Sequence, residues 1–245
     1  MTRRRGSGGL QLRSLSPPEN SAILDALGSV RDPELDEPIT DLGFVTDVEV
    51  VQDAVRVRLR LPTYFCAPNF AYLMVADARE AVESLPGAGR ADIVLEDHHA
   101  SDQINAGVAA DLGFVGTFPG EATRELDGLR LTFRRKAFVA RQERLARSLL
   151  DAGLTMERLA DLRVGELPDT PEARVYLERR AELGLDVGPD AFMLVDPEGV
   201  RVPAERVAAS LRFAQTVRVS IEGNASFCRG MLATRYGLPT AVRDQ

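Results

Sequence analysis

The fold of this chain is decided by three motifs that follow one another: Val30-Arg31-Asp32-Pro33-Glu34-Leu35, Ile39-Thr40-Asp41-Leu42-Gly43-Phe44-Val45 and Pro62-Thr63-Tyr64-Phe65-Cys66-Ala67-Pro68. Proline in the first motif and glycine in the second are typical of tight turns. Two β-type runs separate the second motif from Cys66, and a helix is expected to start directly after the cysteine. The stretch therefore predicts one thiol among several carboxylates at one end of a small sheet.

Hydrophobic periodicity predicts the elements around these motifs. Apolar residues at helical spacing predict a helix that starts at Ser16-Pro17-Pro18-Glu19 and stops before Pro33. Alternating apolar residues predict two strands, 45–51 and 55–61, joined by a turn at Gln52-Asp53, with arginines of the second strand facing solvent. A helix over 68–85 and a third strand over 91–96 complete an α/β (α+β) domain with a small three-stranded sheet and two helices.

The remainder of the chain reads as mostly helical. Residues 113–121 are expected to form a flexible link, and helices are expected over 129–150, 155–162 and 170–183. A short hairpin is predicted over 192–202, then a helix from Pro203 to Phe213, a strand over 217–221 and a last helix capped by Asn224 or Ser226. The expected organisation is a disordered tail over 1–15, an α/β domain over 16–112 and a helical domain of unknown family over 113–245.

Composition narrows the class of protein. The formal net charge of −7 argues against nucleic acid as a partner, because such binding depends on neutralising phosphates. No apolar run approaches the roughly 20 residues of a membrane span, and the N-terminus lacks the apolar segment of a secretory signal. Two widely separated cysteines fit a reducing cytoplasm, although the sequence leaves a Cys66–Cys228 bridge open. We therefore expect a cytoplasmic protein with no membrane partner.

Cys66 is the leading candidate for chemistry. A thiol at a helix N-terminus lies near the positive end of the helix dipole, which favours the thiolate that binds metal or attacks a substrate. Cys228 lies early in a predicted helix and could complete a site with Cys66, although a buried thiol is the simpler interpretation. No CxxC motif, phosphate-binding loop or dinucleotide motif is present, so the residues give no sign of dithiol or nucleotide chemistry.

Histidines and carboxylates supply the remaining candidates. His98 and His99 are the only histidines in the chain and follow the third predicted strand, beside Asp97. Imidazole suits iron and zinc, but neighbouring residues on a strand point to opposite faces, so both could reach one metal only from a loop. The carboxylates Asp32, Glu34 and Asp41 could bind iron, or could simply hydrogen-bond to the amides of their own turns.

The same motifs resemble those of the small iron–sulfur cluster assembly domain. V-x-D-P-E-L, then I-x-D-L-G-x-V, then a cysteine that opens a helix after two strands is that family's pattern, and the resemblance covers roughly residues 19–97. The domain occurs in eukaryotic cytosolic iron–sulfur targeting factors and in bacterial proteins that accompany multicomponent oxygenases such as phenylacetate oxygenase. This chain departs from the usual Cys-Pro, because Tyr64-Phe65 precede the cysteine and the proline comes at Pro68.

The resemblance implies an accessory factor for metal-centre maturation that is not an enzyme. It implies that Cys66 handles iron or an iron–sulfur cluster transiently, with Asp32, Glu34 and Asp41 as a supporting acidic motif. One cysteine cannot hold a cluster that usually takes four protein ligands, so a homodimer, a partner's ligands, or His98, His99 and Cys228 would have to contribute. The expected partners are a cluster donor and a client metalloprotein, and the aromatic version of the motif points to a di-iron monooxygenase hydroxylase.

The sequence leaves two alternative functions open. One is a metal-free adaptor for oxygenase assembly, in which Cys66 is buried. The other is a thiol enzyme in which His98 or His99 acts as the base for Cys66, since a Cys–His pair is an established nucleophile design.

Overall fold

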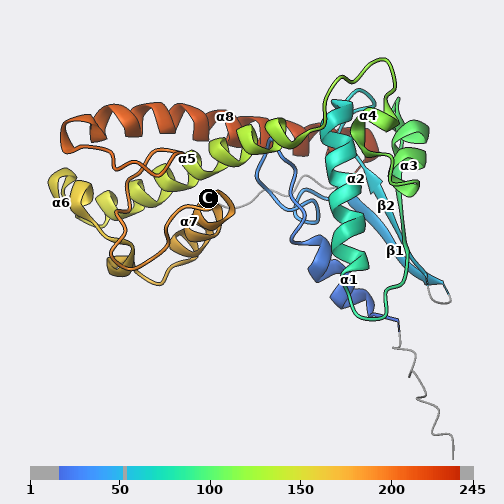
Figure 1. Ribbon diagram of the computed structural model, residues 1–245, viewed down its shortest axis with the longest axis horizontal. Coiled ribbons are helices and arrows are strands. Elements are labelled where there is room, and N and C mark those ends of the chain that lie inside the picture. Colours follow the sequence, from blue (N-terminus) through green and yellow to red (C-terminus); the bar gives the residue numbers. More distant parts are fainter. Residues whose placement is uncertain (1–16, 52–53, 238–245) are drawn as a thin grey trace, which may run out of the picture.

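A computed structural model describes residues 17–51 and 54–237 of the 245-residue chain. The disordered tail expected over 1–15, the Ser16 cap and the Gln52-Asp53 turn lie outside these described residues. The N-terminal part contains a three-stranded sheet with helices packed on it (Figure 1). Its elements are α1 (Asn20–Leu27), β1 (Val45–Val51), β2 (Ala54–Arg60), α2 (Pro68–Glu83), β3 (Ala91–Glu96), α3 (Ser101–Ala109) and α4 (Gly113–Thr117).

The sheet has the order β1-β2-β3, with β1 and β2 antiparallel and β2 and β3 parallel. The alternation in β2 buries Val55, Val57 and Leu59 on the face that α1 and α2 cover (Figure 1). The arginines between them lie on the other face and pair with carboxylates of β3, for example Arg56 with Asp92 at 2.8 Å. The predicted fold class and arginine face of the N-terminal part are therefore confirmed.

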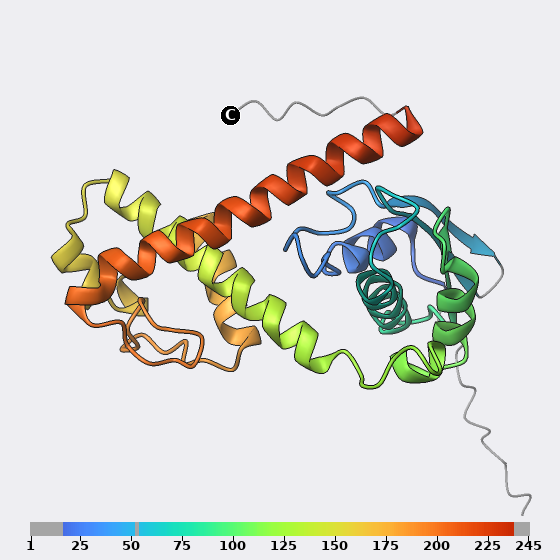
Figure 2. The same ribbon diagram turned by 90° about the horizontal axis from the view of Figure 1, so that it is seen from above.

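The C-terminal part is mostly helical, as predicted. It consists of α5 (Asp127–Asp151), α6 (Met156–Asp161), the 3₁₀ turn η1 (Val164–Glu166), α7 (Pro171–Glu182), the 3₁₀ turn η2 (Ala204–Arg206) and α8 (Val207–Tyr236). The two long helices cross in opposite directions: α5 runs from the N-terminal part into the helical part, and α8 runs back towards the N-terminal part (Figure 2). None of the described helices is long and apolar enough to cross a membrane.

Two hydrophobic clusters form the interior. The first joins the sheet, α1 and α2 and also takes in Phe118, Ala225 and Leu232, so the end of α8 packs against the N-terminal part. The second lies among α5, α6, α7 and the start of α8, with Phe138 and Tyr176 at its centre. The predicted boundary between residues 112 and 113 stays a prediction, but the last helix clearly connects both clusters.

Several sequence-based expectations were wrong. The predicted strand over 217–221 and the cap at Asn224 or Ser226 fall inside α8, where Arg218 pairs with Glu222 one turn later. The alternating valines suggested a strand, but packing of α8 on α5 overrides that local preference. The expected flexible link over 113–121 contains α4, and the first helix begins at Asn20, not at Pro17. The predicted hairpin, in contrast, is present in short form: Val195 and Arg201 make an antiparallel bridge, the Val202 amide donates to the Leu194 carbonyl at 3.0 Å, and the Asp196 amide donates to the Val200 carbonyl at 2.9 Å.

A buried ion cluster fastens the acidic loop between α1 and β1 to the helical part. The Asp36 carboxylate accepts hydrogen bonds from Arg141 of α5 at 2.6 Å and from Arg179 of α7 at 2.7 Å. Arg31 and Arg141 also donate to the Asp36 backbone carbonyl, at 2.9 and 2.8 Å. Asp36 has a positive φ of 51°, a conformation that Asp tolerates better than most residues. Arg179 is only 2% exposed, so the pair that it forms with Asp36 is shielded from water.

We predict that Asp36→Ala destabilises the protein by about 3–5 kcal/mol, because it leaves buried guanidinium groups without their carboxylate. Urea unfolding followed by circular dichroism measures the loss. The matched control is Asp169→Ala, which removes an exposed carboxylate that pairs with Arg174 at 2.6 Å and should cost no more than about 1 kcal/mol. Equal effects of the two substitutions would contradict the role given to the buried cluster.

Candidate functional site

Cys66 lies in the turn between β2 and α2. Helix α2 begins at Pro68 with Ala67 as its N-cap, and no side chain caps it, so the positive end of the helix dipole faces this turn. The thiol is half-buried, and its Sγ lies 3.3 Å from Thr63 Oγ1. A hydroxyl at that distance can donate a hydrogen bond to a thiolate. The turn therefore combines partial access with one neutral donor.

His98 contacts the backbone of this turn. Its Nε2 lies 2.7 Å from the Cys66 carbonyl oxygen, and its Nδ1 accepts a hydrogen bond from the Ala100 amide at 3.2 Å. These contacts define the neutral tautomer with the proton on Nε2, and burial lowers the pKa of His98. Both ring nitrogens are occupied, so His98 positions the cysteine turn and has no nitrogen left for a metal.

His99 differs from its neighbour because it is exposed. Its backbone amide donates to the Tyr64 carbonyl at 3.0 Å, and its Nδ1 lies 3.1 Å from the same oxygen, which leaves Nε2 as the nitrogen a metal could use. The His99 ring packs against Phe65, with centroids 5.8 Å apart, and Phe65 meets Tyr64 edge-on at 5.0 Å. We call Tyr64, Phe65 and His99 the aromatic rim. Phe65 is 77% exposed, which is unusual for so large an apolar side chain.

The three carboxylates of the acidic motif lie in different environments. Asp32 Oδ1 accepts hydrogen bonds from the amides of Glu34 and Leu35, both at 2.9 Å, so it caps its own turn. Burial raises the pKa of the Asp32 carboxyl to about 6, against the two amide hydrogen bonds that lower it. Glu34 accepts a hydrogen bond from Asn224 of α8 at 3.3 Å. Asp41 is exposed and lines a different cavity, beside Arg141.

Cys228 reaches the site from α8. Burial raises the pKa of its thiol to about 11, with further increases from the charges of Asp32, Cys66 and Glu34. Cys66 and Cys228 are both free thiols in the structure. Cys228 is therefore a protonated, half-buried neighbour of the site at neutral pH.

The structure thus brings Cys66, His98, Cys228, Asp32 and Glu34 together, with His99 in the rim and Asp41 elsewhere. In residues 17–51 and 54–237, no three side chains of the His, Cys, Asp and Glu types are arranged to hold a metal ion. No hydrogen bond within that part of the chain joins Cys66 Sγ to either imidazole, so the geometry of a Cys–His nucleophile is not formed. What the described site offers is a single accessible thiol in a preformed turn.

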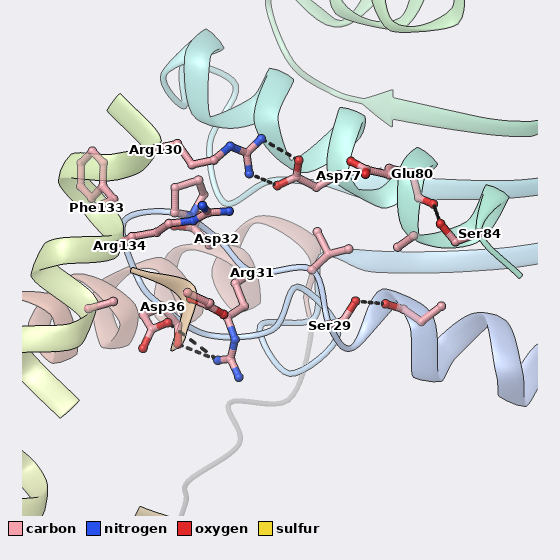
Figure 3. A pocket seen from close by; sticks show the side chains of 16 residues that line it. Ser29, Arg31, Asp32, Asp36, Asp77, Glu80, Ser84, Arg130, Phe133 and Arg134 are labelled. Carbon is pink, nitrogen blue, oxygen red and sulfur yellow. Dashed lines mark hydrogen bonds and ion pairs between the residues drawn. The ribbon is translucent and has the colours of Figure 1, made fainter. Parts of the chain in front are cut away.

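Asp32 also borders a separate cavity of about 510 Å³ between the acidic loop, α2 and α5 (Figure 3). Arg130 crosses its upper side and pairs in bidentate fashion with Asp77 of α2, at 2.6 and 2.7 Å (Figure 3). Arg31 and Asp36 lie on the opposite side. The cavity carries charges of both signs, and the exposed thiol turn is not among its lining residues.

Sequence reasoning missed three residues that shape the site. Thr63 contacts the thiol, Asp36 fixes the acidic loop, and Arg235 of α8 donates to the backbone carbonyls of Leu61 and Asp97, at 3.2 and 2.7 Å. Arg235 thereby ties together the two loops that carry Cys66 and His98. Asp36 lies between two residues of the recognised motif, but its partners are more than 100 positions away, so no local pattern reveals it.

Comparison with known proteins matches the N-terminal part of the chain. The model of a family described as iron–sulfur cluster assembly protein matches residues 20–93, which include Asp32, Glu34, Asp41 and Cys66. An uncharacterized protein of Methanocaldococcus jannaschii is 38% identical over 85 residues, which are 34% of this chain and 86% of that relative. No solved structure is significantly similar to the chain. Through its N-terminal part, the chain belongs to the iron–sulfur cluster assembly protein family.

Membership confirms the coarse resemblance and a general role in iron–sulfur cluster assembly. The roles of the candidate residues stay predictions, both for Cys66 and the acidic motif inside the matched segment and for His98, His99 and Cys228 beyond it. The same holds for the oxygenase-associated subtype.

We predict that Asp32→Asn changes how stability depends on pH. The folded-state pKa of Asp32 lies near 6 and its ordinary value is 3.8, so the folded protein holds the proton more tightly than the unfolded chain does. Stability should therefore fall as pH rises from about 4 to about 6, by at most about 3 kcal/mol at 1.36 kcal/mol per pKa unit. Asn retains the oxygen that caps the turn, so the variant should lose this pH dependence and be the more stable protein above pH 7.

Urea unfolding of both proteins between pH 4 and pH 8 measures this difference. Asp32→Ala is the control, because it removes the cap together with the charge and should be less stable than Asp32→Asn at every pH, by about 1–2 kcal/mol. Parallel pH profiles for the wild type and Asp32→Asn would show that Asp32 is not buried as described.

We also predict that Cys228 resists alkylation. In the Cys66→Ser variant it is the only thiol, and a pKa of about 11 gives roughly 100-fold less thiolate at pH 8 than an ordinary cysteine has. Iodoacetamide labelling followed by mass spectrometry should show correspondingly slow modification. The same variant unfolded in urea is the control, and equal rates in the folded and unfolded states would contradict the burial of Cys228.

Proposed function

We propose that this protein takes part in iron–sulfur cluster assembly as a docking and transfer factor that lends one thiolate, from Cys66, to a cluster whose other ligands come from a bound partner. The client and the donor are then the proteins that complete the coordination. In this proposal the cluster is cargo, and the chain is not a self-sufficient carrier.

The observation that carries the proposal is the state of the ligands around Cys66. Both nitrogens of His98 are used in hydrogen bonds, the Cys228 thiol is kept protonated by burial, and Asp32 caps its own turn. Cys66 is the donor in this group that combines partial exposure with a hydroxyl neighbour and a helix N-terminus. A [4Fe–4S] or [2Fe–2S] cluster usually takes four protein ligands, so one thiolate leaves room for a partner's.

The aromatic rim supports a docked partner. Exposed aromatic side chains are enriched at protein interfaces, where they bury a large area with few rotatable bonds. Tyr64 and Phe65 directly precede the thiol in sequence, so a protein that covers the rim also excludes water from Cys66. Exclusion of water matters because it protects a transferring cluster from hydrolysis and oxidation.

The proposal that the client is a di-iron monooxygenase hydroxylase rests on the aromatic form of the cysteine motif alone. Nothing in the geometry distinguishes this client from another metalloprotein. A metal-free adaptor would use the same aromatic rim and would differ only in the role of Cys66. Reconstitution with iron and sulfide distinguishes the adaptor from the transfer factor.

The test is anaerobic reconstitution of the full chain with ferrous iron and sulfide, in the absence and in the presence of glutathione as a substitute for the partner's thiolates. We expect visible cluster absorbance only when glutathione is present, and we expect Cys66→Ser to reduce it at least about tenfold. Cys228→Ser is the matched control and should bind as the wild type does, because burial raises the pKa of the Cys228 thiol and disfavours the thiolate that a metal binds.

Three results would overturn the proposal. A cluster formed without glutathione would indicate a self-sufficient carrier, and loss of the cluster in Cys228→Ser would make Cys228 a ligand. Equal absorbance in the wild type and Cys66→Ser would favour the metal-free adaptor.

A further inference from the structure

Helix α8 presents one face that no other described element covers. The helix contacts α5 with its first half and the N-terminal part with its second half, both on the same side. Seen from above, α8 lies in front of α5 where the two helices cross (Figure 2). A helix with a free face normally fills that face with charged residues.

The free face of α8 is almost uncharged. Its exposed side chains are Ala, Phe, Thr, Val, Ser, Gly, Asn and Met, with Arg212 as the only charged one. In contrast, the exposed residues of α5 include Arg134, Arg135, Lys136 and Arg147. The whole chain is 27% charged, so the scarcity of charged residues on this face distinguishes it from the chain as a whole.

Two phenylalanines dominate the face. Phe213 is 68% exposed and Phe227 is 66% exposed, and both lie on the same line of the helix because they are two heptads apart. Val219 and Met231 are exposed on the same side. Between the two phenylalanines lie Ser220 and Gly223, and a Cβ added to Gly223 would meet nothing within 4 Å. Small residues at this point allow another helix to approach closely.

Phe213 and Phe227 are equidistant from Ser220, on either side of it along this face. When two copies of α8 cross antiparallel at Ser220, Phe213 of one copy lies opposite Phe227 of the other, and Ala209 lies opposite Met231. Two-fold dimers require such a self-complementary surface, in which each patch meets its own copy. The free face extends about 33 Å from Ala209 to Met231 at 1.5 Å per residue.

The two phenylalanines alone supply about half of the area that a modest interface needs. At about 200 Å² per exposed phenylalanine, the two rings offer about 270 Å² in each copy, or roughly 540 Å² in a pair. A specific interface needs about 1,000 Å² in total, and Val219, Met231 and the small side chains between them supply further area.

We propose that this face of α8 binds a second copy of the chain, and that the two helices pair antiparallel across a two-fold axis at Ser220. This pairing does not involve the cluster chemistry of Cys66.

Sedimentation velocity of the full chain across the micromolar range tests the proposal. The wild type should sediment as a dimer of 26.7 kDa chains, and Phe213→Glu and Phe227→Glu should each raise the dissociation constant at least about tenfold. Leu131→Glu is the matched control, because it places the same charge at an exposed apolar position of α5 and should leave the dimer intact. Circular dichroism shows whether each variant is folded.

Disulfide trapping tests the orientation. In chains with Cys66→Ser and Cys228→Ser, a Phe213→Cys protein mixed with a Phe227→Cys protein should form a cross-linked pair under mild oxidation, whereas each alone should not. A wild-type protein that is monomeric, a dimer that persists in both folded glutamate variants, or efficient cross-linking of Phe213→Cys to itself would each overturn the proposal.

Discussion

The structure depends on the Asp36 carboxylate and the guanidinium groups of Arg141 and Arg179 that surround it. This carboxylate comes from the loop that also carries Asp32 and Glu34, and the two arginines come from α5 and α7. The contact therefore fixes the acidic motif against the helical part of the chain. Removal of one member of such a buried cluster is costly, because the charges left behind have no water to solvate them. Its effect is to hold a functional loop in one position.

Helix α8 completes the arrangement from the other side. Arg218 of α8 pairs with the buried Glu143 of α5 at 2.5 Å, so the first half of α8 is anchored on the helical part. Its second half brings Cys228 beside the acidic loop and places Arg235 on the carbonyls of Leu61 and Asp97. The loops that carry Cys66 and His98 are thus held by a residue at the far end of the sequence. Contacts of this kind hold the turn that carries the Cys66 thiol in one orientation without the help of a bound metal.

Local sequence was enough for the sheet, its two covering helices and the position of Cys66 before α2, because each of these depends on short-range periodicity and on proline or glycine at turns. It was not enough for α8, where Val217, Val219 and Ile221 alternate like a strand but lie in a helix stabilised by packing on α5. For the site, the sequence predicted which types of residue take part but not how they contact one another. The hydrogen bonds of both His98 ring nitrogens to backbone groups depend on tertiary contacts that no local pattern contains. The same is true of the pairing of Asp36 with arginines over 100 positions away.

The central claim is that this chain contributes one thiolate to a shared cluster. Native mass spectrometry of the anaerobically reconstituted protein with glutathione tests it most directly, because the mass of the complex counts the external thiols bound with each cluster. Every cluster-bearing species should contain glutathione, and Cys66→Ser should form at least about tenfold less of it than the wild type. A cluster-bearing species composed only of protein, iron and sulfide would contradict it, because the chain would then supply all of the ligands itself.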